Sequence, residues 1–279
     1  MLPSILLSLR EGLEAALIIG IILSMLTRLN SQHLKIVVWQ GAAAAIAASL
    51  LAGMGLNFLG LEFEGKAEEI FEGLATLFAA GVLTWMIFWM QKQGQDLKKK
   101  IESDTNQAIS TGKKALFSLA FITVFREGLE LAVFLLATSF VSGGKLTLVG
   151  ASIGLLSAVI LGWAIFSYSN RLNLNMFFLA TNILLILFAS GLVAYGVHEL
   201  NEAGWIPSII EHVWDINHIL NEKSQFGLIF KTLFGYNGNP SLSEVVSYLL
   251  YFVSMFAIFF RFRRSELAKH TSQRNNQTY

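Results

Sequence analysis

Cysteine is absent from this chain of 279 residues, and proline occurs only three times. Without cysteine there is no disulfide, iron–sulfur cluster, thiolate metal site or cysteine nucleophile, so oxygen or imidazole must hold any metal. Charged residues are also scarce: they make up 14% of the chain, against 54% hydrophobic residues, and the mean hydropathy is +0.58. This composition nearly excludes a soluble globular enzyme.

Long stretches free of charge define the class of protein. Residues 36–61, 146–170 and 172–198 contain no Asp, Glu, Lys or Arg. Each exceeds the roughly 20 residues that an α-helix needs to cross a bilayer core of about 30 Å. Hydropathy predicts an all-α integral membrane protein with seven transmembrane helices. These are expected at 3–28, 36–60, 70–91, 115–141, 146–169, 174–199 and 243–261.

The basic residues outside the spans are divided unevenly between the two sides of the membrane. Most fall on the side that holds segments 92–114 and 262–279. The positive-inside rule makes that side cytoplasmic, which predicts a multi-pass cell-membrane (inner or plasma membrane) protein with its N-terminus outside and its C-terminus in the cytoplasm. The exterior side is acidic and would concentrate cations. Because the basic residues are sorted by membrane side, the expected partner is the lipid bilayer and not nucleic acid.

Two segments between spans are predicted to lie outside the membrane. Residues 92–114 mix six lysines with three acidic residues and are interpreted as a solvated cytoplasmic linker. In the exterior loop 201–242, apolar residues recur at helical spacing and predict an amphipathic helix on the outer interface. These residues are Ile206, Ile209, Ile210, Val213 and Leu220. Ser241 and Glu244 have the spacing of a capping box that would start the last span.

An internal repeat links the two halves of the chain. Residues 10–14 and 126–130 both read Arg-Glu-Gly-Leu-Glu, and weaker similarities follow in the same order. Because each copy contains three spans, the copies must be inverted in the membrane, as in many secondary transporters. The expected organisation is a first three-helix repeat at 1–91, the linker 92–114, an inverted second repeat at 115–200, the exterior loop 201–242, a seventh helix at 243–261 and a cytoplasmic tail at 262–279.

The two motifs place ionisable side chains near the middle of the bilayer. A charge there costs on the order of 3 kcal/mol, so these groups must face inward and pair. The six residues are Arg10, Glu11, Glu14, Arg126, Glu127 and Glu130. With all four carboxylates ionised, the cluster carries about two net negative charges, which a bound cation could neutralise. Carboxylate ligands suit hard metal cations and are compatible with iron in either common oxidation state.

Other interpretations of these charges stay open. The arginines and glutamates could form bridges that only lock the first span to the fourth, or the glutamates could relay protons. At the level of function, the alternatives are a transporter of another cation, such as manganese, lead or protons, and an intramembrane enzyme that uses the glutamates as acid and base.

The doubled Arg-Glu-Gly-Leu-Glu motif, in the first and fourth of seven spans, resembles the oxidase-dependent iron permease family, which includes the fungal high-affinity iron permease and bacterial EfeU-type permeases. The resemblance covers the whole chain. It implies transport of iron, as Fe3+ or Fe2+, and no enzymatic activity. Iron would be the transported substrate, with no permanently bound cofactor, and an exterior or periplasmic iron oxidase or iron-delivery protein would supply it. The implied iron ligands are Glu11, Glu14, Glu127 and Glu130, with Arg10 and Arg126 as supporting charges.

Acidic residues on the exterior side are candidates for a cation entrance. One group opens the third span, where Glu72 lies deepest; its members could instead complement the helix dipole. A second group closes the sixth span, where His198 and Glu202 are four residues apart and could contact a metal together, although a solvated helix end has the same composition. The candidates are Glu68, Glu69, Glu72, His198, Glu199 and Glu202.

Overall fold

The structure, a computed structural model, describes residues 1–61, 64–93, 97–168, 174–218, 224, 227, 230–231 and 234–276. These residues form helices and connecting turns, with no strand among them. The helices are α1 (Leu2–Arg28), η1 (Gln32–Leu34), α2 (Lys35–Leu61), α3 (Lys66–Gln93), α4 (Leu97–Thr111), α5 (Lys113–Ser142), α6 (Gly144–Tyr168), α7 (Leu174–Glu202) and α9 (Leu242–Asn276).

The helices cover all seven predicted spans. Five of them have the length and apolar composition to cross a membrane: α2, α3, α6, α7 and α9. The other two, α1 with 27 residues and α5 with 30, are long enough but carry the charged motifs in their middle. The all-helical membrane fold is therefore confirmed, and the count of seven crossings stays a prediction.

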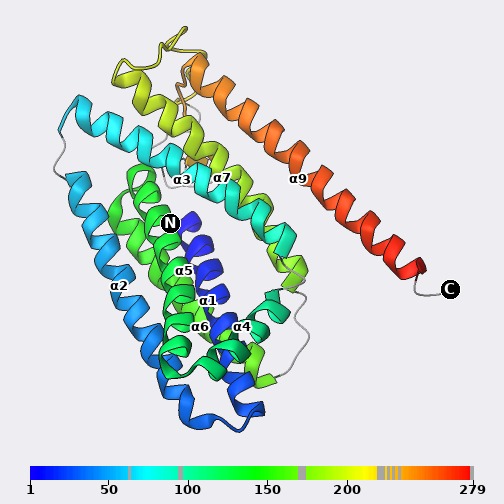
Figure 1. Cartoon of the computed structure of the whole chain (residues 1–279). Helices are drawn as coiled ribbons and strands as arrows, with labels where there is room; N and C mark the ends of the chain where they lie inside the picture. The colour runs from blue at the N-terminus through cyan, green and yellow to red at the C-terminus, as the bar shows by residue number, and fades with distance from the viewer. Residues whose placement is uncertain are drawn as a thin grey trace.

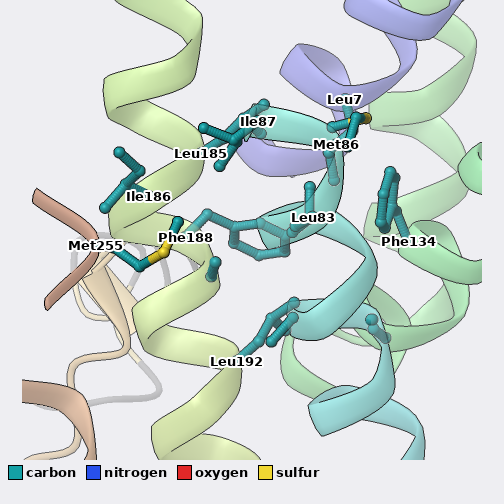
Figure 2. Packing of buried hydrophobic residues seen from close by; sticks show 14 of the residues in the cluster. Leu7, Leu83, Met86, Ile87, Phe134, Leu185, Ile186, Phe188, Leu192 and Met255 are labelled. Atoms are coloured by element: carbon teal, nitrogen blue, oxygen red, sulfur yellow. The ribbon is translucent and has the colours of Figure 1, made fainter. Parts of the chain in front are cut away.

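The helices pack in pairs across the two halves of the chain. Helix α1 packs along α6, α2 packs along α5, and α3 packs along α7. Figure 1 shows α3 and α7 side by side, with α9 beside α7 and its C-terminal end extending away from the other helices. One apolar core lies between α3, α7 and α9, and Leu7 and Phe134 reach it from α1 and α5 (Figure 2). A second core joins α1, α2, α4 and α5.

Close glycine contacts recur at matching places in the two halves. A Cβ atom on Gly41 would lie 2.7 Å from the Phe117 carbonyl oxygen, and one on Gly150 would lie 2.6 Å from the Met1 carbonyl oxygen. Phe117 precedes its motif by nine residues, as Met1 precedes its own. Because no side chain fits at these positions, glycine is what allows α2 to approach α5 and α6 to approach α1 so closely.

A second pair of contacts shows the direction of the helices. A Cβ atom on Gly53 would lie 3.4 Å from Ala132 Cβ, and one on Gly162 would lie 3.0 Å from Ala16 Cβ. Together with the contacts at Gly41 and Gly150, these contacts advance in the same direction along both partners. Helix α2 therefore runs parallel to α5, and α6 runs parallel to α1.

The interpretation of residues 92–114 as a solvated linker is wrong for part of that segment. Residues 97–111 form helix α4, whose Ile101, Thr105 and Ala108 are buried against α1 and α5. These three positions recur at helical spacing and give α4 one buried face among its charged residues. The lysines dominate the composition, and composition alone conceals that face.

Within the segment 201–242, where an amphipathic helix is predicted, the described residues 203–218 form turns and bends, whereas the described residues 227, 230, 231 and 234 are helical. Gly204 and Ile209 adopt positive φ angles of 78° and 59°, and Pro207 lies between them. The backbone is instead tied across the loop, because Val213 N donates to Pro240 O and Ile216 N to Gly238 O. Ile209 is 75% exposed and Ile210 and Val213 are exposed, whereas Ile206 is partly exposed and Leu220 lies outside the described residues.

The capping box at the start of α9 is confirmed. Ser241 N donates to Glu244 Oε1 at 3.0 Å, and Glu244 N donates to Ser241 Oγ at 3.3 Å. These two bonds satisfy backbone groups that would otherwise lack partners at the helix start. Helix α9 then continues beyond the predicted span 243–261 and includes most of the expected tail, up to Asn276.

Candidate metal site

The first motif lies in α1 and forms a buried ion-pair network. Arg10 is 0% exposed, and Glu11 and Glu14 are buried beside it. The guanidinium Nη1 lies 2.9 Å from Glu11 Oε1, and Nη2 lies 3.0 Å from Glu14 Oε1. One helix face carries the arginine and the second glutamate because they are four residues apart. The arginine thus neutralises part of the charge that burial would otherwise make costly.

The second motif lies in α5 and is less enclosed. Arg126 Nε lies 3.0 Å from Glu130 Oε1, and Nη2 lies 3.7 Å from Glu127 Oε1. Both glutamates are buried, whereas the Arg126 side chain is 36% exposed. The two copies of the motif therefore have the same ion pairs in different surroundings.

The carboxylates of the two motifs converge between α1 and α5. Glu11, Glu14 and Glu127 each offer an oxygen, and these three oxygens lie within 4.8 Å of one another. Oxygen ligands of a hard cation such as Ca2+ lie about 2.3–2.6 Å from it, so two ligands of one ion are at most about 5 Å apart. The three glutamates can therefore contact a single ion.

Further oxygens in the cluster are free to bind a cation. In the part of the chain that the structure describes, Glu11 Oε2, Glu127 Oε2 and Glu130 Oε2 are buried and have no hydrogen-bond partner. Buried oxygens without partners are costly, and a bound cation would remove that cost. Glu130 is not among the three glutamates that can contact one ion, but it pairs with Arg126 at the edge of the same cluster.

The motif glycines lie at close contacts with neighbouring helices. A Cβ atom on Gly12 would lie 2.7 Å from Ala158 Cβ of α6, and one on Gly128 would lie 2.5 Å from Ser49 Cβ of α2. Any larger side chain at either position would push the neighbouring helix away. The glycine of each motif therefore brings its glutamates close to the core of the bundle.

Two residues of α3 contact the motif arginines and were not predicted as site residues. Arg10 Nη1 donates to Met86 Sδ at 2.7 Å. The Arg126 guanidinium lies over the Trp89 ring, with Cζ 4.1 Å from the ring centroid. Apolar residues in an apolar span carry no signal for such contacts, so the sequence alone could not identify them.

Two of the predicted entrance residues, Glu72 of α3 and Glu199 of α7, contact the same tyrosine. Glu68 and Glu69, the other predicted residues of α3, do not take part in this contact. Tyr195 of α7 donates its hydroxyl to Glu72 Oε2 at 2.9 Å and also contacts the Glu199 carboxylate. Glu69, Glu72 and Glu199 are partly buried, whereas Glu68 is exposed. The structure therefore brings Glu72 and Glu199 together across α3 and α7.

His198 is held by carboxylates on both ring nitrogens. Its Nε2 lies 3.3 Å from Glu202 Oε1, and its Nδ1 lies 3.0 Å from Glu244 Oε1. Asn237 Nδ2 also donates to Glu244 Oε2 at 2.8 Å. Both ring nitrogens are thus engaged. Since His198 belongs to α7 and Glu244 to α9, their contact connects these two helices. Glu244 was predicted only as a helix cap and not as a partner of His198.

These features define a class: a helical membrane protein of several spans whose buried carboxylates, supplied by two related helices, can bind a cation. Comparison with known proteins gives the family. The chain belongs to the iron permease FTR1 family, whose model matches residues 1–269. It is therefore an iron permease, and its function is iron transport across a membrane.

Known relatives agree along most of the chain. It is 37% identical over 257 residues to the ferrous iron permease EfeU of Escherichia coli O6:H1, covering 91% of this chain and 93% of that protein. It is 35% identical over 254 residues to the ferrous iron permease EfeU of Yersinia pestis, covering 90% of each chain. No solved structure matches the chain.

Proposed function

We propose that this permease takes up ferrous iron through the cluster of Glu11, Glu14, Glu127 and Glu130. The observation that carries the proposal is the convergence of three buried carboxylates within 4.8 Å. Four carboxylates and two guanidinium groups leave about two negative charges, which one divalent cation balances and a trivalent cation exceeds. The names of the relatives, ferrous iron permease, support the same choice.

In this proposal, the arginines have a role both when the site is empty and when it holds a cation. In the empty site, Arg10 and Arg126 pair with the glutamates and keep the buried charge low. An arriving cation replaces part of this pairing, and the arginines recover it when the cation leaves. A divalent cation moving inward gains roughly 4.6 kcal/mol per 100 mV of membrane potential, so uptake is the favoured direction.

The proposal includes seven crossings and two inverted three-helix repeats plus α9. The first helix of each repeat runs parallel to the second helix of the other repeat: α1 runs parallel to α6, and α5 runs parallel to α2. Two inverted copies produce this arrangement, which therefore supports inversion. The distribution of basic residues supports an exterior N-terminus and a cytoplasmic C-terminus. An exterior iron oxidase or iron-delivery protein, implied by the resemblance, completes the proposed uptake system.

The oxidation state of the substrate is tested by radio-iron uptake into iron-starved cells that produce the chain. A ferrous-specific chelator outside the cells should reduce uptake to the level of cells without the chain, because it removes the ion that the site accepts. A ferric-specific chelator serves as the control and should leave uptake in the presence of ascorbate unchanged. Uptake that persists with the ferrous chelator and stops with the ferric chelator would mean that the transported ion is Fe3+ and not Fe2+.

Glu72 and Glu199 are proposed to collect the cation before it reaches the buried cluster. We expect Glu72→Gln to raise the iron concentration at half-maximal uptake about threefold to tenfold with little change in the maximal rate, because it removes one charge from a partly buried acidic pair. Radio-iron uptake measured against iron concentration checks this, with the exposed Glu64→Gln as the matched control. An unchanged half-saturation concentration would remove the entrance role.

A further inference from the structure

Helix α3 holds one guanidinium group from each motif. Met86 Sδ accepts a hydrogen bond from Arg10, and the Trp89 ring lies under the guanidinium of Arg126. Met86 and Trp89 are three residues apart, so they lie on the same face of α3. Two arginines that belong to different helices, α1 and α5, are thus held by one short segment of a third helix.

The contacts fix which side of each arginine faces the carboxylates. Arg10 Nη1 lies 2.9 Å from Glu11 Oε1 while it donates to Met86, so the guanidinium lies between α3 and the motif. A thioether is a weak acceptor, and an aromatic face attracts a guanidinium without neutralising it. Neither contact competes with a carboxylate for charge. Both therefore orient the arginines and leave oxygens such as Glu130 Oε2 open.

The second repeat has no equivalent of this arrangement. The similarity between residues 77–82 and 187–192 aligns Met86 with Gly196 and Trp89 with Glu199. Gly196 has no side chain, and Glu199 contacts Tyr195 in the outer acidic pair. Among these aligned positions, the thioether and the aromatic ring therefore occur in α3 alone, which indicates a specific role there and not a shared packing requirement.

We propose that Met86 and Trp89 are positioning residues of the permease: α3 holds Arg10 and Arg126 through them, so that the motif carboxylates stay open to the cation. This inference rests on the proposed function. Each guanidinium group already pairs with one oxygen of its glutamates, and without these contacts it is free to reach the second oxygens, such as Glu11 Oε2 and Glu130 Oε2, as well. Loss of either contact then weakens iron binding while the carboxylate ligands themselves remain.

The test measures iron uptake against iron concentration for Met86→Leu and Trp89→Leu. Leucine keeps apolar bulk but has no acceptor and no ring. We expect the half-saturation concentration to rise about threefold to tenfold, in line with the strength of a cation–π contact. Trp89→Phe, which keeps an aromatic face, should recover most of the affinity. The exposed Met54→Leu and Trp39→Leu are matched controls and should behave as the intact chain.

Ferrous iron binding to purified protein separates positioning from folding. Affinity is measured per folded molecule by calorimetry for Trp89→Leu, Arg126→Gln and the double variant. If Trp89 acts through Arg126, the double variant should bind no more weakly than Arg126→Gln alone. Additive losses, or unchanged affinity in both Trp89→Leu and Met86→Leu, would overturn the inference.

Glu14→Gln in the same assays separates failure of the positioning role from failure of the proposed metal site. Loss of iron binding in Glu14→Gln together with unchanged affinity in the α3 variants would reject the positioning role and leave the proposed site intact. Unchanged binding in Glu14→Gln would reject the proposed site, and the inference with it.

Discussion

Glu14→Gln and Glu130→Gln should each reduce iron uptake by more than about 100-fold, to the background of cells without the chain. Glutamine has nearly the same shape as glutamate, so the packing of the helices is preserved. The change removes a carboxylate and leaves Arg10 or Arg126 without one of its ion-pair partners. Breaking a fully buried pair such as Arg10–Glu14 costs about 3–5 kcal/mol, which corresponds to more than a hundredfold effect. For Glu130, whose partner Arg126 is 36% exposed, the expected loss comes mainly from removing a carboxylate of the cluster. Radio-iron uptake by iron-starved cells checks the expectation.

The control for this experiment is Glu211→Gln. Glu211 is exposed in the exterior loop and far along the chain from both motifs, so its neutral variant should keep most of the uptake. The amount of protein in the membrane is measured in every case. Unchanged uptake in both motif variants would leave the ion pairs as structural bridges and would revive an intramembrane enzyme as the alternative.

Gly128→Ala is the second change for which we expect a large effect. The new methyl group would lie 2.5 Å from Ser49 Cβ and closer still to its hydroxyl group, so α2 and α5 must move apart. Overpacking of this kind costs about 1–3 kcal/mol, and the shift also displaces Glu127 from the cluster. We expect iron uptake to fall at least tenfold, measured per molecule in the membrane.

A second substitution should restore the function lost in Gly128→Ala. Ser49→Gly removes the atoms that collide with the new methyl group, so the double variant should regain a large part of the uptake. Ser49→Gly alone should have a small effect. The equivalent pair in the other half, Gly12→Ala with Ala158→Gly, should behave in the same way. Failure of both rescues would show that the glycines serve something other than close packing.

Much of the fold could be predicted because the membrane imposes simple rules on sequence. The predicted spans agree with the helices since a spanning helix must be long and apolar. The motif residues could be proposed as a site because charge within a span is costly. Their repetition indicated a pairing between the first and fourth spans, and Glu11 and Glu127 do converge there.

The features that sequence reasoning missed depend on contacts between distant segments. Among the α4 residues whose burial the structure describes, three are buried, Ile101, Thr105 and Ala108, in a segment rich in charged residues, so composition favoured a solvated linker. The apolar residues between 206 and 213 have helical spacing, yet Gly204 and Ile209 adopt positive φ angles and the backbone of this part of the loop bonds to residues 238 and 240. Met86 and Trp89 are apolar residues in an apolar span, so the sequence does not mark them. Their role depends on the arginines that lie beside them in the folded chain.

The most direct test of the account uses liposomes that contain only the purified chain, with a metal-sensitive dye inside. Ferrous iron should enter liposomes with the intact chain, faster when the lumen is negative, since a divalent cation gains roughly 4.6 kcal/mol per 100 mV. Glu14→Gln should give the flux of empty liposomes. Equal iron flux through the intact chain and Glu14→Gln would contradict passage through the carboxylate cluster between α1 and α5.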